Sequence, residues 1–176
     1  MTEHSFVECT LERHGDAILE IFNEAIANST ALYDYKPRTR ESMVGWFEAK
    51  VAGNFPVIGI EDAQGQLLGF ASFGEFRPHP AYKYSVEHSV YVHHEHRGQG
   101  LGRMLLNRII EEAEAFGAHS VIGAIDAENE ASLRLHESLG FARVGTLPQV
   151  GFKFGRWLDL ALMQKVVSGP VNPVDG

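Results

Sequence analysis

Hydrophobic side chains recur along the chain with two different periods, and these periods predict which segments are helices and which are strands. A spacing of three to four residues lines apolar side chains on one helix face, whereas alternation suits a strand with one buried face. The helical period is present in residues 15–26, 39–50, 101–116 and 129–138. Strand patterns occupy residues 6–10, 55–61, 67–76, 85–92, 120–126, 141–144 and 157–166.

The order of these segments indicates the fold class. The strands at 55–61 and 67–76 are separated by the short polar stretch 62–65, which predicts a hairpin. The strands at 85–92 and 120–126 instead flank a helix, which is the arrangement of a crossover connection. We therefore expect an α/β fold built on a mixed sheet with helices on both faces.

Composition narrows the classes of protein to consider. The 176 residues are 44% hydrophobic, which is enough for a core, and no segment is apolar for long enough to cross a membrane. A net charge of −8 argues against nucleic acid as a partner, because a phosphate backbone is bound by basic surfaces. The single cysteine, Cys9, excludes an intrachain disulfide and is interpreted as a small buried side chain.

Length and the two ends of the sequence suggest the domain organisation. We expect one domain over residues 1–167, followed by a flexible tail at 168–176 that offers few large apolar groups to pack. The first ten residues have no basic start followed by an apolar run, so no secretory signal is expected. These observations favour a cytoplasmic location.

A glycine-rich stretch between a strand and a helix is the strongest chemical signal in the chain. It consists of Arg97, Gly98, Gln99, Gly100, Leu101 and Gly102. Glycines let successive backbone N–H groups approach a polyanion, and the following helix adds the positive end of its dipole. The pattern predicts a loop that binds the phosphates of a small anionic ligand, and the alternative is a tight connection that binds nothing.

Three histidines, His93, His94 and His96, precede this loop. They form no coherent set of metal ligands with other residues in the sequence, so we interpret them as a solvated turn and expect no metal.

The loop and the segments around it resemble the GCN5-related N-acetyltransferase (GNAT) superfamily. The stretch from Arg97 to Gly102 is similar to the acyl-CoA pyrophosphate loop of that superfamily, and Asn129 and Ser132 are similar to its second CoA-binding segment. Residues 86–92, Leu135 with His136, and residues 148–159 further resemble the branch that acetylates phosphinothricin, methionine sulfoximine and methionine sulfone. The resemblance covers nearly all of residues 6–166.

This resemblance implies acetyl-CoA as the co-substrate and a set of residues that contact it. Backbone groups of the second half of the fourth strand are expected to bind the pantetheine arm, and the glycine-rich loop and the start of a later helix the rest of the cofactor. The residues implied are Val90, Tyr91, Val92, Arg97, Gly98, Gln99, Gly100, Leu101, Gly102, Arg103, Asn129 and Ser132.

Acetyl transfer to an amine needs a base, because an α-ammonium group is mostly protonated near neutral pH. Glu87 is the leading candidate, since it interrupts a strand otherwise suited to burial; the alternative is a glutamate that faces solvent or an ion pair. The resemblance implies that His136 forms an acid–base pair with Glu87. A hydrogen-bonded histidine packed against the protein is the alternative for His136.

Substrate contacts are carried over from the same branch. Arg77 is expected to bind the carboxylate of an amino-acid-like substrate, in a loop shaped by Pro78 and His79. The other expected contacts are Leu32, Tyr33, Glu87, His88, Ser89 and Lys153. The resemblance also implies a homodimer.

Two other functions remain open from the sequence. A peptide or protein N-terminal acetyltransferase would share the cofactor-binding half of the site, and a non-catalytic acyl-CoA sensor would share the cofactor but not the need for a base. A nucleotide-binding loop fits poorly, because the stretch lacks the Lys and Ser or Thr that hold phosphate and magnesium.

Overall fold

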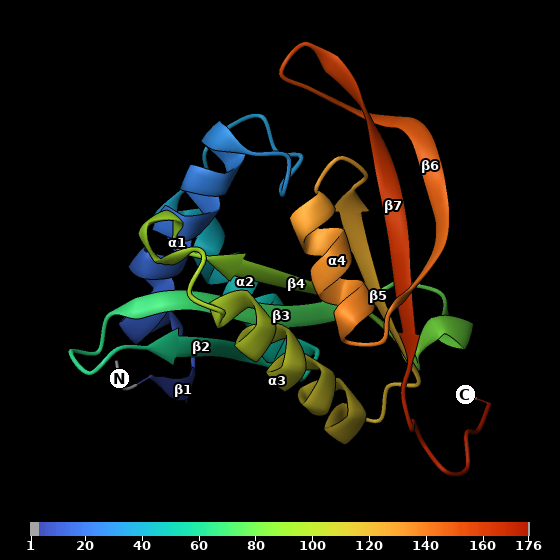
Figure 1. Cartoon of the computed structure of the whole chain (residues 1–176). Helices are drawn as coiled ribbons and strands as arrows, with labels where there is room; N and C mark the ends of the chain where they lie inside the picture. The colour runs from blue at the N-terminus through green and yellow to red at the C-terminus, as the bar shows by residue number, and fades with distance from the viewer. Residues whose placement is uncertain (1–3, 176) are drawn as a thin grey trace. The chain divides into compact units, whose positions relative to one another are not determined.

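The computed structural model describes residues 4–175 of the chain (Figure 1). Its helices are α1 (Leu11–Asn28), α2 (Arg40–Ala52), α3 (Leu101–Phe116) and α4 (Glu130–Ser138). Its strands are β1 (Ser5–Glu8), β2 (Val57–Glu61), β3 (Leu67–Glu75), β4 (Ser85–Val92), β5 (Ser120–Asp126), β6 (Ala142–Lys153) and β7 (Arg156–Val166). Short 3-10 helices at Pro80–Tyr82 and His94–His96 lie before and after β4.

The strands form a mixed sheet in the order β1-β2-β3-β4-β5-β7-β6. β4 pairs with β5 in parallel, from Ser85 opposite Ser120 to Glu87 opposite Ile122. The pairs β1–β2, β2–β3, β5–β7 and β6–β7 are antiparallel. The expected α/β fold with a mixed sheet is confirmed, and β4 and β5 have the bounds that the sequence pattern predicts.

The chain divides into two compact units, and both β4 and α3 contribute residues to each of them. One unit comprises the residues up to 74 together with 89–109, and the other comprises residues 75–88 together with those from 110 onward.

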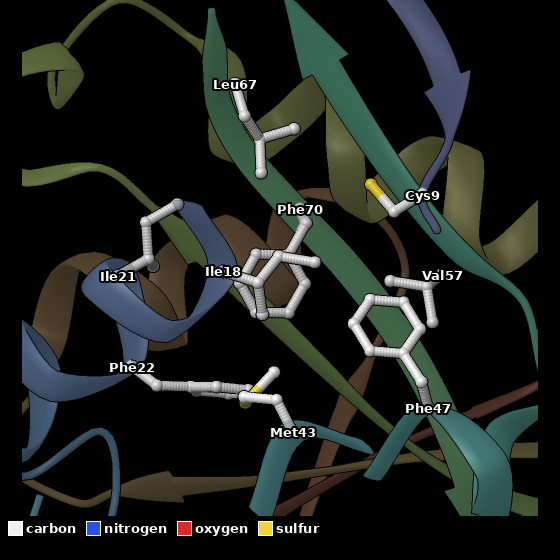
Figure 2. Packing of buried hydrophobic residues seen from close by; sticks show 9 residues of the cluster. All are labelled: Cys9, Ile18, Ile21, Phe22, Met43, Phe47, Val57, Leu67 and Phe70. Atoms are coloured by element: carbon white, nitrogen blue, oxygen red, sulfur yellow. The ribbon is translucent and has the colours of Figure 1, made fainter. Parts of the chain in front are cut away.

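The core of the first unit is a cluster of aliphatic and aromatic side chains between α1, α2 and the β1–β3 strands (Figure 2). Phe22 of this cluster contacts Phe70, Trp46 and Tyr91 edge-on, with ring centroids 5.2 to 5.5 Å apart. The members of the cluster are Cys9, Ile18, Ile21, Phe22, Met43, Phe47, Val57, Leu67 and Phe70. Cys9 is buried as the sequence suggests, and burial raises the pKa of its thiol to about 12, so it is unreactive at neutral pH.

Helices cover both faces of the sheet in this unit. Phe70 of β3 points toward α1 and α2, so its neighbour Gly69 presents the opposite face. On that face a Cβ at position 69 would lie 3.1 Å from Leu105 of α3 and 2.7 Å from the carbonyl oxygen of Tyr91 in β4. Gly69 is therefore required by the close approach of β3 and β4 rather than by a turn.

A buried polar network joins α1 to β2 in the same unit. The side chain of His14 is buried; its Nδ1 accepts the N–H of Thr10 at 2.9 Å, and its Nε2 lies 3.0 Å from the Glu61 carboxylate. Arg13 donates to the other carboxylate oxygen of Glu61 at 2.7 Å. The buried carboxylate is thus compensated by two partners, as burial of a charge requires.

The second unit is built on β5, β7 and β6. β5 pairs with β7 along its whole length, and β7 pairs with β6 as a long hairpin, drawn in orange and red in Figure 1. α4 ends at Ser138, and Gly140 has the positive φ of 87° that a left-handed cap requires, as predicted. Lys165 of β7 donates to the carbonyl oxygen of Leu139 at 2.6 Å and so caps this helix end.

Two predicted elements have a bound that is wrong by more than two residues. α1 begins at Leu11 rather than at residue 15, because Thr10 caps the helix by accepting the N–H of Arg13, whereas the apolar period starts only at Ile18. The strand predicted at 141–144 continues to Lys153. Glycines and Pro148 obscure that extension, but proline is tolerated because β6 is the edge strand and its register with β7 shifts between Leu147 and Gly151.

Two side chains on α2 provide a test of the first unit's core. Met43 is fully buried, whereas Val51 on the same helix is 75% exposed. Met43→Ala is expected to lower the free energy of unfolding by about 2–5 kcal/mol, because it removes buried atoms and leaves a cavity. Val51→Ala is expected to change it by less than about 0.5 kcal/mol. Denaturant unfolding of the two variants measures this difference, and equal effects would contradict the described packing.

Candidate active site

The glycine-rich loop has the backbone geometry of an anion-binding turn. Gly98 and Gly100 have φ values of 79° and 82°, and no atom lies within 4 Å of a Cβ placed on either. Conformation, not crowding, is therefore the reason for glycine at both positions. α3 starts at Leu101, and the loop residues Arg97 to Gly100 are exposed. The first N–H groups of α3 thus follow directly on an exposed turn in which Gly98 and Gly100 have no side chains, which is the arrangement that phosphate groups bind.

The positive charge of Arg97 at this loop is partly neutralised by a carboxylate of the first unit. Arg97 donates to Glu24 of α1 at 2.6 Å, and its Nε lies 3.4 Å from the carbonyl oxygen of Val92. These contacts hold the guanidinium beside the end of β4, where Val90, Tyr91 and Val92 are half-buried.

The interpretation of the histidines before the loop as a solvated turn is wrong for His93. Its side chain is buried, its Nδ1 accepts the N–H of Glu95 at 3.3 Å, and its Nε2 lies 3.5 Å from the carboxylate of Glu20. Ligand-type atoms of His93, Glu95 and His96 lie within 4.8 Å of one another, a spacing that a metal ion can bridge. Both ring nitrogens of His93 already have partners, however, so the cluster is explained as a cap on the 3-10 helix. The absence of a metal stays a prediction.

Glu87 and His88 point to opposite faces of β4. Successive side chains of a strand alternate between faces, and the burial of this strand follows that rule, with Val86 and His88 buried and Glu87 exposed. The two residues that the sequence assigns to catalysis and substrate contact therefore serve different sides of the strand.

His88 lies against His136 of α4 in the second unit. Their Nε2 atoms are 3.1 Å apart, the two ring planes differ by 20°, and both side chains are buried. Phe141 packs edge-on against both rings, with centroids 5.5 and 5.1 Å away. His136 is thus brought together with His88, whereas the resemblance pairs it with Glu87.

Burial keeps both imidazoles neutral. It lowers the pKa of His88 to about 3, with a further contribution from the neighbouring His136, and it lowers the pKa of His136 despite a hydrogen bond to the backbone of Ser132 that acts in the opposite direction. A neutral ring carries one N–H and one lone pair, so each histidine has one donor and one acceptor to satisfy.

The environment of Glu87 suits a base. Removal from water raises the pKa of this carboxyl above its ordinary 4.5, while the guanidinium of Arg77 acts in the opposite direction. Arg77 is exposed in the loop after β3, over the ring of Phe76 at 5.3 Å. A carboxylate with a raised pKa accepts a proton more readily, and the nearby guanidinium can bind an anionic group of a substrate.

The remaining predicted residues divide between the two units. Asn129 caps α4 by accepting the N–H of Ser132 at 3.1 Å, so these two cofactor candidates share one helix start. Lys153 is buried at the end of β6 with its Nζ 4.9 Å from the ring of Phe154, rather than extended into solvent. Leu32 packs against the core of the first unit, and Tyr33 is 38% exposed.

The contact between His88 and His136 is the feature of the site that sequence reasoning missed. The available signal is Gly123, which interrupts the apolar middle of β5. A Cβ there would lie 2.9 Å from Nε2 of His88 and 3.4 Å from Nε2 of His136, so the two imidazoles need a glycine opposite them. A glycine inside a strand marks such close approaches.

Comparison with known proteins identifies the family. The sequence matches the Acetyltransferase (GNAT) family over residues 17–141, which is most of the chain. The chain belongs to the GNAT acetyltransferase family.

No helix within residues 4–175 combines the length and hydrophobicity needed to cross a membrane.

Several relatives of this GNAT chain are named for the reaction that they catalyse. It is 45% identical to an L-methionine sulfoximine/L-methionine sulfone acetyltransferase of Salmonella typhimurium. The alignment spans 148 residues, which is 84% of this chain and 86% of that protein. A phosphinothricin acetyltransferase from Sinorhizobium meliloti, solved in complex with AcCoA, superposes with a TM-score of 0.91 at 31% identity, over 97% of this chain and 92% of that one. A ribosomal-protein-alanine N-acetyltransferase structure from Brucella melitensis gives 0.89 at 42% identity, over 93% and 99%.

The electrostatic coupling of Glu87 to Arg77 is open to direct measurement. Because the guanidinium charge lowers the pKa of Glu87, Arg77→Gln is expected to move the titration midpoint of that carboxyl to higher pH. Arg77→Lys keeps the charge and is the matched control, with a midpoint near that of the parent protein. A 13C NMR titration of the Glu87 side chain measures all three midpoints. An unchanged midpoint in Arg77→Gln would show that the two groups do not interact.

Proposed function

We propose that this chain transfers the acetyl group of acetyl-CoA to the α-amine of a small amino acid or amino-acid analogue. Methionine sulfoximine, methionine sulfone and phosphinothricin are the acceptors that the relatives indicate. The single observation that carries the proposal is Glu87, an ionisable carboxyl in β4 whose pKa is raised by partial removal from water and which interacts with the guanidinium of Arg77.

The reaction follows from these groups. The amine nitrogen attacks the thioester carbonyl carbon, the new C–N bond forms, and the C–S bond of acetyl-CoA breaks. Glu87 accepts the first proton that the ammonium group loses, directly or through water. The nitrogen loses a second proton as the amide forms, and CoA leaves as a thiolate that takes up this proton. The products are the N-acetylated amino acid and CoA. No covalent acyl-enzyme is needed, and the one cysteine, Cys9, has a raised pKa of about 12 in the core.

The cofactor contacts are proposed at the glycine-rich loop, at the end of β4 and at the start of α4. The exposed turn at Gly98 and Gly100, with the first N–H groups of α3, is suited to the pyrophosphate. The backbone of the β4 end would bind the pantetheine arm and supply an N–H to the thioester oxygen. The proposed contacts are Val90, Tyr91, Val92, Arg97, Gly98, Gln99, Gly100, Leu101, Gly102, Arg103, Asn129 and Ser132.

The acceptor contacts are proposed around Arg77. Its guanidinium would bind the α-carboxylate by a charge-assisted hydrogen bond, which places the neighbouring α-amine toward Glu87. The other proposed contacts are Leu32, Tyr33, Pro78, His79, His88, Ser89 and Lys153. For Lys153 the proposal requires that its buried Nζ be reached from within the site.

A second candidate function, acetylation of a peptide or protein N-terminus, is favoured by the likeness to the ribosomal-protein-alanine acetyltransferase structure. The two differ in the acceptor, since a peptide has no free α-carboxylate for Arg77. Thiol release from acetyl-CoA, followed with methionine sulfoximine, methionine sulfone, phosphinothricin and a short peptide, separates them. Turnover with the amino-acid analogues supports the first function, and turnover with the peptide alone would replace it by the second.

Removal of the proposed base provides a sharper test. Glu87→Gln is expected to lower kcat by about 10²- to 10⁴-fold, the usual contribution of a general base, with acetyl-CoA binding unchanged. Because partial removal from water raises the pKa of Glu87, the folded state disfavours its charge, and stability falls as pH rises through that pKa. The variant is therefore expected to melt no lower than the parent at pH 7.

Steady-state kinetics and calorimetric titration with acetyl-CoA measure these two effects. Glu75→Gln, at the exposed end of β3, is the matched control and is expected to keep the parent kcat. Loss of acetyl-CoA affinity in Glu87→Gln would contradict the role as a base.

We also propose that the chain forms a homodimer through the β6–β7 hairpin. The hairpin exposes a group of large apolar side chains, which in soluble proteins marks an interaction surface. Trp157 is 60% exposed and packs against Phe152 with ring centroids 5.1 Å apart. The exposed members are Val144, Leu147, Val150, Phe152, Phe154, Trp157 and Val166.

Sedimentation analysis tests the dimer. The parent protein is expected to sediment at about twice the chain mass of 19.5 kDa, and Trp157→Lys as the monomer, because a charge buried in an apolar interface is left unpaired. Val171→Lys is the control, because it also replaces an exposed apolar side chain but lies outside the hairpin, and it is expected to remain dimeric. A monomeric parent protein would overturn the proposal.

A cytoplasmic location, the absence of nucleic acid and membrane partners, and a single domain over residues 1–167 with a tail at 168–176 stay predictions. Resistance to phosphinothricin or methionine sulfoximine would be a consequence of the proposed activity in a cell exposed to those compounds.

A further inference from the structure

We propose that His136 acts through His88 rather than on the substrate. It accepts the Nε2–H of His88 and thereby leaves Nδ1 of His88 as a lone pair for an N–H group of the bound reactants. In this arrangement His136 is a positioning residue and His88 the imidazole that meets the substrate or cofactor. The inference rests on the proposed acetyl transfer for its function but on hydrogen-bond geometry for its structure.

The backbone carbonyl of Ser132 determines which ring nitrogen of His136 carries the hydrogen. Its Nδ1 lies 2.7 Å from the carbonyl oxygen of Ser132, one turn earlier in α4. A carbonyl oxygen only accepts, so Nδ1 of His136 must carry the hydrogen. The hydroxyl of Ser132 lies at 3.5 Å from the same nitrogen, too far to compete with the carbonyl. A neutral His136 protonated at Nδ1 has its lone pair at Nε2.

The position of the hydrogen on His136 determines which nitrogen of His88 carries a hydrogen. The two Nε2 atoms are 3.1 Å apart, which is within hydrogen-bond distance, and the two ring planes are nearly parallel, 20° apart, with centroids 5.0 Å from each other. Because Nε2 of His136 is an acceptor, Nε2 of His88 must be the donor. Neutral His88 then has its lone pair at Nδ1, so one backbone carbonyl fixes the tautomers of both rings.

Of the four ring nitrogens of His88 and His136, Nδ1 of His88 is the one without a hydrogen-bond partner among the described residues. Both nitrogens of His136 are engaged, so this ring has neither a free hydrogen nor a free lone pair to offer a leaving thiolate. Nδ1 of His88 is buried and has no hydrogen-bond partner among the described residues. A buried acceptor of this kind is rarely left unpaired in proteins, and where it occurs it calls for a ligand or water.

The group that completes this site is an N–H donor. Since burial keeps His88 neutral at pH 7, its Nδ1 attracts a hydrogen without removing it, which suits orientation of an amide or amine N–H. Two reactants of the proposed reaction carry such groups, namely the pantetheine arm of acetyl-CoA and the amine of the acceptor. Both present the same chemistry to Nδ1, and ligand titrations distinguish them.

The unligated protein provides the first test, by 15N NMR of histidine-labelled protein at pH 7. Two-bond 1H–15N correlations identify which ring nitrogen carries hydrogen, with resonances assigned from H88N and H136Q proteins. The proposal expects Nδ1–H on His136 and Nε2–H on His88. The opposite tautomer on either ring overturns it, whatever reaction the protein catalyses.

Saturation with acetyl-CoA alone, and with methionine sulfoximine alone, identifies the donor. The His88 Nδ1 resonance is expected to move toward a hydrogen-bonded acceptor with one of the two. If it responds to neither, while other resonances show that both ligands bind, His88 does not meet the reactants and that half of the proposal is wrong.

Two substitutions at position 136 separate positioning from proton donation. Gln places an acceptor oxygen near the position of Nε2 but has no titratable proton, whereas Leu fills similar space without any acceptor. H136L is expected to lower kcat by about 5- to 150-fold, the fold-change that corresponds to leaving the buried Nε2–H of His88 unpaired. H136Q is expected to stay within about fivefold of the parent, at the lower end of that range.

Two outcomes of this comparison are decisive. In H136L the His88 tautomers are expected to mix, and in H136Q the Nε2–H form is expected to persist, a difference that a purely structural role would not produce. Thermal unfolding of both variants shows whether they fold. An equal loss of kcat in folded H136Q and H136L, of about 10²-fold or more, would identify His136 as a direct proton donor instead.

If the parent protein acetylates no tested amine, the proposed function fails, while the NMR tautomers still confirm or refute the histidine arrangement. The two failures are therefore distinguishable.

Discussion

The hydrogen bond between His88 and His136 is the interaction on which the chemistry of the second unit depends. It requires two buried imidazoles to remain neutral, a backbone carbonyl at Ser132 to fix their hydrogens, and a glycine at position 123 to leave room for them. α4 is held in place at both ends by polar caps, Asn129 at its start and Lys165 at its close. The helix caps and the strand glycine thus contribute to the site by keeping one pair of nitrogen atoms at hydrogen-bond distance.

β4 separates two kinds of chemistry by the alternation of its side chains. Glu87 lies on the exposed face, where partial removal from water raises the pKa of its carboxyl and Arg77 provides a cation. His88 lies on the buried face, where the surroundings suppress its charge. One face is therefore suited to taking a proton from an amine, and the other to holding neutral hydrogen-bonding groups. Acetyl transfer uses both properties, since an amine must be deprotonated and a thioester must be oriented.

Much of the fold could be predicted from the sequence, because strong periodicity and turn residues define most elements. The bounds of β4 and β5 and the role of Gly140 are confirmed. The length of β6 could not be predicted, because its pairing with β7 is set by register and an edge position, not by local pattern. In the site, the glycine-rich loop could be recognised from the sequence and the family is confirmed, whereas the role of Glu87 stays a prediction. The burial of His93 and the contact of His136 with His88 were not, because both depend on partners distant in the sequence.

Mass spectrometry of both protein and small molecule, after incubation with acetyl-CoA and methionine sulfoximine, tests the central claim of direct acetyl transfer most directly. The account predicts N-acetylated methionine sulfoximine together with a protein of unchanged mass. Absence of the acetylated product, or a protein-bound acetyl group that passes into the product on addition of the acceptor, would contradict it.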